Sequence, residues 1–182
     1  MAAANRGVSR LRCGKSGWNR YDTTKFIHNE KCLMDKIEQF YDVIRKEMAV
    51  TLATSAEGFV TMRLVSPVLH QGGILIFTSP NSKKYRQLQA NPRCGIAAGP
   101  FFAEAFAKFC GAAMLSGNAE LRDAYCQKFP HAFEEGVEFG GRNADFLLLS
   151  PTRISGWAYE NDIPTENGIP TIPFDIELKT DG

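Results

Sequence analysis

The sequence lacks any apolar run of the roughly 18–20 residues that a bilayer-spanning helix needs, and it lacks paired cysteines. Its cysteines are odd in number, irregularly spaced and never in a C-x-x-C pair. They are Cys13, Cys32, Cys94, Cys110 and Cys126. A disulfide framework or a zinc knuckle requires paired, close spacing. We therefore expect reduced thiols, a cytoplasmic location and no metal site.

An excess of charge is also missing. Lysine and arginine total 21 against 20 aspartates and glutamates, which gives a formal net charge of +1. Proteins that bind nucleic acid or an anionic membrane surface usually carry a basic excess, so we expect neither as a partner. The composition, 44% apolar and 23% charged, is instead typical of a globular chain that buries a core.

The two ends of the chain differ from its middle. Residues 1–25 carry six basic residues and one acidic residue, Asp22. We expect residues 1–30 to be an extension that docks on the domain or stays mobile. An organelle transit peptide is the alternative, because such peptides are Arg-rich and poor in acids. Residues 31–160 are predicted to form one domain, and residues 161–182 an extended Pro-rich tail whose alternating segment Phe174–Leu178 forms an edge strand.

Hydrophobic periodicity predicts a mainly β (α+β) domain. Apolar residues at helical spacing predict three helices, at Met34–Glu47, Asn81–Ala90 and Ala119–Phe129. Runs of β-branched and aromatic residues predict strands at Ala49–Thr54, Phe59–Leu69, Gly73–Thr78, Cys94–Ala98, Phe109–Gly117, Phe146–Leu149 and Arg153–Tyr159. We expect a hairpin at Gly58 with positive φ, and a loop over Gly99–Lys108. About six short strands favour a small closed barrel, because closure removes exposed edges.

One predicted strand carries a charge in its middle. Side chains alternate along a strand, so the apolar residues of one face are expected to line the core. They are Val60, Met62, Leu64 and Val68. Arg63 lies on the other face with Thr61 and Val65. A charge opposite a core face points at water, a partner chain or a ligand.

A second feature is the polar turn that leads from Phe77 into a helix. Asn81 or Ser82 is a good N-cap, yet Lys83 and Lys84 follow in the first helical turn, where the helix dipole favours anions. A bound phosphate explains this arrangement. It accepts from free backbone N–H groups, from the two ammonium groups and from nearby hydroxyls, which belong to Thr78, Ser79 and Ser82. An ordinary basic surface helix is the alternative.

Ordered motifs across residues 40–125 resemble those of the pyridoxamine 5'-phosphate oxidase-like FMN-binding split-barrel family. Met48–Gly58 is similar to the family's "LATS-x-x-G" hairpin, and Arg63-Leu-Val65 to its Arg-x-Val strand. The "FTxxxSxKxxxLxxNP" segment is matched by Ile76–Ser79, Ser82–Lys84, Leu88 and Asn91-Pro92. Leu115–Gly117, followed by Ala119-Glu120, resembles the strand that ends before an acidic helix.

The resemblance implies a six-stranded split β-barrel with flanking helices, assembled as a homodimer with two FMN sites between the protomers. Arg63 and Lys84 would hold the FMN phosphate, with support from Lys83, Ser82 and Thr78. Backbone groups of four residues would flank the isoalloxazine and ribityl parts; they are Leu64, Val65, Ser66 and Phe77. The family's late tryptophan would fall at Trp157, although a core position that closes the barrel is the favoured alternative there.

Two departures separate the chain from the vitamin-B6 oxidases of that family. Those enzymes carry a glutamine near the position of Ala112, and they end with an Arg/His cluster that grips substrate phosphate. Here no Arg or His follows Arg153. We expect an FMN-dependent oxidoreductase of another small substrate. The alternatives are a non-catalytic flavin or haem binder that acts as a sensor, carrier or store, and a barrel that only dimerises.

Overall fold

The computed structural model describes residues 30–133, 143–158 and 172–178. The predicted N-terminal extension over residues 1–30 therefore lies almost wholly outside the described residues, as does much of the C-terminal tail. None of the described helices is long and apolar enough to cross a membrane.

Eight antiparallel strands form one sheet, which is two more than the six-stranded barrel that the family resemblance implies. They are β1 (Val50–Ala56), β2 (Phe59–Val65), β3 (Val68–His70), β4 (Gly73–Thr78), β5 (Arg93–Ala98), β6 (Phe101–Ala112), β7 (Asp145–Ala158) and β8 (Ile172–Glu177). The strand order is β2-β1-β5-β6-β7-β4-β3, and β8 pairs with β7. The end strands β2 and β3 are consecutive in the chain. Ser66 and Pro67 alone join them, so the sheet must curve back on itself, and the mainly β fold class is confirmed.

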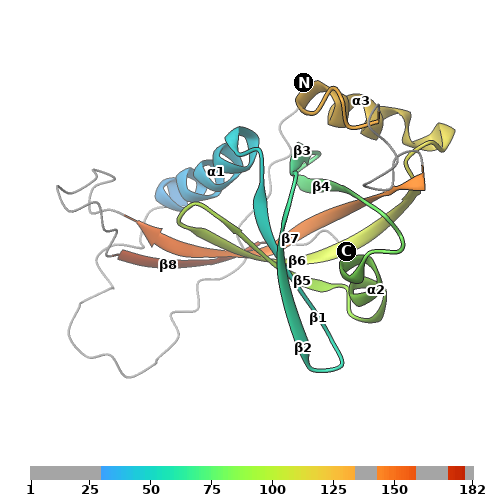
Figure 1. Ribbon diagram of the computed structural model, residues 1–182. Helices are drawn as coiled ribbons and strands as arrows, with labels where there is room; N and C mark the ends of the chain where they lie inside the picture. Colours follow the sequence, from blue (N-terminus) through green and yellow to red (C-terminus); the bar gives the residue numbers. More distant parts are fainter. Residues whose placement is uncertain (1–29, 134–142, 159–171, 179–182) are drawn as a thin grey trace.

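Three helices flank the sheet: α1 (Glu30–Lys46), α2 (Lys83–Ala90) and α3 (Ala119–Lys128). In Figure 1, α1 and α3 lie on the upper side, and α2 lies beside the lower part of β1 and β5. A short 3-10 turn, Ser116–Asn118, precedes α3. All three helices were predicted, and α2 begins after Ser82, whose hydroxyl accepts a hydrogen bond from the backbone N–H of Tyr85.

The core divides into two clusters. The larger one fills the curved sheet beneath α1, where Phe40 and Ile44 pack against strand residues such as Leu52, Ile74 and Leu149. The smaller one lies under α3 and contains Val68, Leu75, Tyr125 and Phe146. The two clusters place β4 and β7 at the centre of the molecule.

The predicted strand boundaries are wrong in several places, and the strand predicted to end at Gly117 ends at Ala112. Residues 101–108 belong to β6, because Phe101, Ala103 and Ala105 are buried while Phe102, Glu104 and Phe106 are exposed, which is strand alternation. The predicted break near Pro151 is absent from β7, because the register shifts between Glu104 and Ala105, and Pro151 pairs with Ala105 at that irregularity. A bulge accommodates the missing proline N–H. By contrast, β4 has the predicted bounds, and Gly58 has the predicted positive φ of 79°.

The predicted faces of β2 are reversed. Val60, Met62 and Leu64 are 68%, 67% and 69% exposed, whereas Val65 is 8% exposed and belongs to the core. Of the apolar set expected inside, only Val68 is buried, and it lies beyond the break at Ser66-Pro67 in β3. The cause is the position of β2 at the end of the sheet, where the interior side is lined by polar residues that bond to one another.

Candidate functional site

The guanidinium of Arg63 lies on the interior side of β2 and is tied to oxygen atoms of three elements. Its Nη1 donates to the backbone oxygen of Leu52 (3.2 Å) and to Oγ1 of Thr54 (2.6 Å), both on β1. Its Nη2 donates to Oγ1 of Thr61 and to Oε1 of Gln87 on α2 (3.3 Å). Burial lowers the pKa of Arg63, but a guanidinium stays protonated at any physiological pH.

Lys84 lies beside Arg63, in the first turn of α2. Burial, and then the positive charge of Arg63, lower the pKa of Lys84 from its usual 10.5. Lys83, the other lysine of this turn, is exposed. Within the part of the chain that the structure describes, no carboxylate forms an ion pair with Arg63 or Lys84. The structure therefore brings together two unneutralised cations that the sequence places 21 residues apart.

Hydroxyl groups surround the start of α2. Thr78, at the end of β4, is almost fully buried, and its Oγ1 lies 3.2 Å from Oγ of Ser82. The Oγ of Ser79 accepts a hydrogen bond from the backbone N–H of Asn81 (3.2 Å). The backbone oxygen of Ser79 accepts one from the backbone N–H of Ser82 (3.0 Å). These contacts fix the turn that carries Lys83 and Lys84. Hydroxyls, helix N–H groups and two cations are the donors that hold a phosphate in proteins.

Gln87 joins this site although the sequence gives no motif for it. The side chain is 6% exposed, and its Oε1 accepts from Thr54 (2.7 Å), Thr61 (2.6 Å) and Arg63. Its Nε2 donates to the backbone oxygen of Phe59 (3.3 Å). The only sequence signal is its place one helical turn after Lys84, beside the buried Leu88.

Tyr85, the residue after Lys84 on α2, links the site to the start of β7. Tyr85 is buried, its ring packs edge-on against Phe109, and its hydroxyl donates to Oδ2 of Asp145 (2.6 Å). Burial and this hydrogen bond raise the pKa of Tyr85 to about 12. Asp145 is thereby occupied by a neutral donor, and α2 is anchored to β7 as well as to β1 and β2.

The four residues predicted to offer backbone groups lie in different environments. Leu64 is exposed and Val65 is buried, as alternation on β2 requires. The backbone oxygen of Ser66 accepts from the hydroxyl of Tyr125 on α3 (3.3 Å). The ring of Phe77 packs against Tyr125 and Phe133. All four lie on strand β2, the turn after it, or β4, within three residues of Arg63 or Thr78 in sequence.

Trp157 is not brought to this site within one chain. Thr78 pairs with Asp145 at the start of β7, whereas Trp157 pairs with Pro173 near the other end of the same 14-residue strand. Trp157 is 49% exposed, so the favoured prediction that it closes the barrel core is wrong. Its side chain is instead available on the molecular surface.

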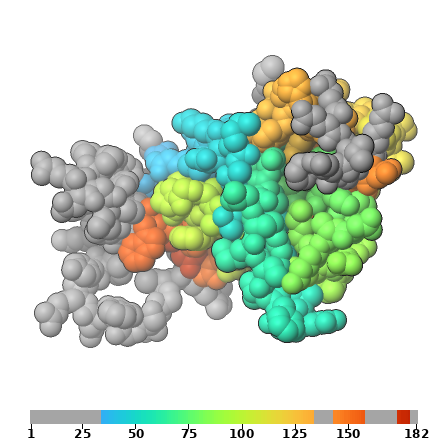
Figure 2. All heavy atoms as spheres, in the orientation of Figure 1, coloured from blue at the N-terminus to red at the C-terminus, as the bar shows by residue number. Residues whose placement is uncertain are grey.

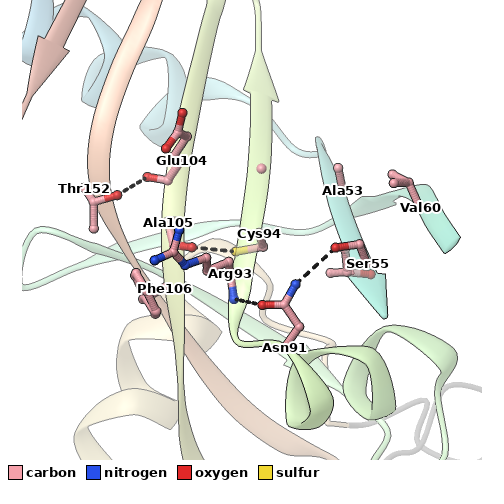
Figure 3. A pocket seen from close by; sticks show the side chains of 12 residues that line it. Ala53, Ser55, Val60, Asn91, Arg93, Cys94, Glu104, Ala105, Phe106 and Thr152 are labelled. Atoms are coloured by element: carbon pink, nitrogen blue, oxygen red, sulfur yellow. Dashed lines mark hydrogen bonds between the residues drawn. The ribbon is translucent and has the colours of Figure 1, made fainter. Parts of the chain in front are cut away.

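A cleft of about 530 Å³ lies on the outer face of the sheet, over β1, β5 and β6 (Figure 3). The side chain of Arg93 lies over the ring of Phe106, 5.3 Å from its centroid, and the Nδ2 of Asn91 donates to Oγ of Ser55 (3.1 Å). Val60 of β2 contributes to the opposite wall. The cleft thus borders the exposed apolar face of β2.

Comparison with protein families gives one clear match. A family model described as pyridoxamine 5'-phosphate oxidase matches residues 34–158. That span includes most of α1, the strands β1 to β7, and every candidate residue of the site described above. No curated protein matches the sequence.

Several solved structures share the fold. A FAD-binding protein from Mesorhizobium loti is 17% identical, with a TM-score of 0.54 over 65% of this chain and 91% of that one. General Stress Protein 26 from Bacillus anthracis is 14% identical, with a TM-score of 0.54 over 66% and 92%. A heme binding protein from Mycobacterium smegmatis is 19% identical, with a TM-score of 0.53 over 65% and 52%.

Proposed function

The chain belongs to the pyridoxamine 5'-phosphate oxidase family, and from that premise we propose that it binds FMN, with the phosphate held between Arg63 and Lys84. The observation that carries the proposal is the pair of cations beside the start of α2, to which the described residues supply no carboxylate partner. Two adjacent positive charges repel each other, and burial adds to the cost of keeping both. A dianionic phosphate removes this free-energy cost of repulsion and burial. The cations of an ordinary basic surface helix are solvated and would not incur that cost.

In this proposal each part of the site has a separate task. Arg63 and Lys84 bind the phosphate charge, and the hydroxyls of Thr78 and Ser82, with Ser79 and Lys83 in support, donate hydrogen bonds to its oxygens. Backbone groups of the segment from Leu64 to Ser66 and of Phe77 orient the ring system. When bound, the flavin supplies hydride chemistry, and the protein supplies position and exclusion of water.

Comparison of FMN with riboflavin tests the phosphate site, since riboflavin lacks only the phosphate. Charge-assisted hydrogen bonds contribute about 1.5–3 kcal/mol each, so the loss of two weakens binding by roughly 100-fold or more. Isothermal titration of the apoprotein with each flavin measures the ratio. Equal dissociation constants would rule out the site at Arg63 and Lys84.

The activity that fits best is an FMN-dependent oxidoreductase acting on a small substrate. A non-catalytic binder of flavin or haem is the second candidate, because one structural relative is itself a heme binding protein. An absorbance spectrum of the purified protein before and after addition of FMN separates flavin from haem. Flavin maxima support flavin binding, a Soret band supports haem binding, and a colourless protein that ignores FMN contradicts both.

We also propose that the protein is a homodimer with the flavin sites at the interface. Val60, Met62 and Leu64 form an exposed apolar row on β2, which lies at the surface in Figure 2, and the outer face of β6 adds Phe102 and Phe106. Monomers rarely expose large contiguous apolar patches, and a second copy is the simplest cover for this one.

The register of the sheet explains why this face suits close packing. Met62 lies opposite Ala53, and Ala53 lies opposite Gly95, so small residues form the floor between β2 and the phenylalanines of β6. Trp157 lies on the same outer face. It is two residues from Ser155 on β7, so the two side chains share a face, and Ser155 pairs with the exposed Phe102 of β6. In a dimer packed through this face, we propose that the exposed Trp157 of each protomer lies at the interface.

A further inference from the structure

We infer that Gln87 is a positioning residue that fixes the guanidinium of Arg63 while leaving its charge available to an anion. This inference rests on the proposed phosphate site and adds to it a residue that no motif marks. Gln87 does not touch the anion in this arrangement. It acts through Arg63: the amide oxygen of Gln87 holds the guanidinium in place, and because that oxygen is neutral it does not cancel the guanidinium charge.

The contacts of Gln87 make it the centre of a closed polar network. Its Oε1 accepts from Arg63 Nη2, from Thr61 Oγ1 on β2 and from Thr54 Oγ1 on β1, and its Nε2 donates to the backbone oxygen of Phe59. In Figure 1, α2 lies beside the lower part of β1, from which it reaches both strands of the hairpin. One buried amide therefore ties α2 to β1 and β2 at the level of Arg63.

Every acceptor of Arg63 in this network is electrically neutral. The acceptors are the backbone oxygen of Leu52, two threonine hydroxyls and the amide of Gln87. A buried guanidinium is more often held by a carboxylate, which orients it but cancels its charge. In this site the neutral acceptors orient the guanidinium of Arg63 without neutralising it, so its positive charge remains available to a ligand.

Gln87 also sets the spacing between the two cations. Gln87 and Lys84 are three residues apart on α2, so their side chains project from the same side of the helix. Because Gln87 is bonded to Arg63, the helix cannot slide along β2 without breaking a buried hydrogen bond. The distance from Arg63 to Lys84 and to the N-cap Ser82 is thereby fixed before an anion arrives.

The test compares Gln87→Glu with Gln89→Glu in the full-length apoprotein, with FMN and riboflavin as probes. Glutamate has the shape of glutamine, so Q87E keeps the acceptor oxygen and adds one negative charge beside Arg63. We expect Q87E to reduce the FMN-to-riboflavin preference at least tenfold, while riboflavin affinity changes less than threefold. Q89E adds the same charge at an exposed position two residues along α2, and its preference should stay within twofold of wild type.

Gln87→Met separates position from charge. It removes the acceptor and adds no charge, so we expect a weaker preference together with a lower melting temperature, because Thr54 and Thr61 lose a buried partner. If Q87E and Q87M lower only the melting temperature and keep the wild-type preference, Gln87 is merely structural and the inference is overturned. A wild-type protein with no preference would instead overturn the phosphate site itself, so the two failures are distinguishable.

Discussion

The ammonium of Lys84 lies close enough to the guanidinium of Arg63 for the Arg63 charge to lower the Lys84 pKa, in addition to the effect of burial. In the described part of the chain neither cation has a carboxylate partner. Charge is therefore concentrated at one point of a protein whose formal net charge is only +1. Global charge balance and a local anion site are independent properties.

The lowered pKa of Lys84 predicts a pH window for FMN binding. The second pKa of a phosphate ester is about 6, so affinity rises as pH increases through that value. Affinity should then fall at alkaline pH, beginning below the ordinary lysine value of 10.5, because the free protein loses the Lys84 proton early. Flavin titrations from pH 5 to 10 measure the window. Lys84→Arg should abolish the alkaline decrease, and a decrease that persists in K84R would contradict the assignment.

The same pKa predicts the opposite trend for the apoprotein. Because the folded-state pKa of Lys84 lies below its unfolded value, the unfolded chain binds more protons between those two pH values. The free energy of unfolding contributed by this group therefore rises with pH across that interval. Urea unfolding of wild type and K84R at several alkaline pH values checks the sign, since K84R should lack this contribution.

Met62→Asp is expected to produce a monomer that remains folded. Met62 is 67% exposed on β2, so the aspartate meets water in a single protomer and costs little stability. In a dimer packed through this face, the same charge would be buried without a partner, at a cost of several kcal/mol. Light scattering gives the mass and circular dichroism the fold. Gln127→Asp, at an exposed position on α3, is the control and should leave the mass unchanged. A wild-type monomer would contradict the proposed interface.

Lys128→Met is expected to destabilise the fold by about 1–3 kcal/mol. The Nζ of Lys128 donates to the backbone oxygens of Ile44 (2.9 Å), Glu47 (2.6 Å) and Pro67 (2.9 Å), so it ties α3 to the end of α1 and to the link between β2 and β3. Chemical denaturation measures the loss. Lys108→Met, at an exposed position of β6, should change stability by less than about 0.5 kcal/mol. Equal effects would show that the three contacts are not stabilising.

The protein is expected not to oxidise pyridoxine or pyridoxamine phosphate at a useful rate. Arg153 is the last arginine of the sequence, and its guanidinium donates from Nε to Asp175 Oδ1 (2.6 Å) and from Nη2 to Oδ2. It is therefore already neutralised, and the exposed Asp175 and Glu177 of β8 would repel a phosphorylated substrate. An assay of pyridoxal phosphate formation by the FMN-loaded protein decides this, and efficient turnover would overturn it.

The sequence was sufficient where local chemistry decides the structure. The bounds of β4, the positive φ at Gly58 and the capping role of Ser82 each follow from one or two residue types at one position. Two of the principal candidate residues, Arg63 and Lys84, were found for the same reason. A charge in mid-strand and a cation in a first helical turn are both locally unfavourable, and such conflicts often mark function.

The errors arose at a strand at the end of the sheet and at contacts between residues far apart in the sequence. The apolar alternation on β2 was interpreted as a core face, yet the same pattern arises when a strand presents an apolar face to another molecule. Gln87 was missed because its role depends on Thr54, Thr61 and Arg63, which the helix meets only after the sheet has formed. Periodicity identifies which residues share a face, but it does not identify what covers that face.

The topology of the sheet also has a consequence for the rate of folding. Short connections join β1 to β2, β3 to β4 and β5 to β6, whereas the pairing of β4 with β7 joins Ile74 to Leu149. Closing so long a loop costs chain entropy before any contact repays it, and domains dominated by such pairings fold in milliseconds to seconds. The β1–β2 hairpin that carries Arg63 can form early. The phosphate site around Arg63 is complete only after the slower pairing of β4 with β7 has positioned β4 and the helix α2 that follows it.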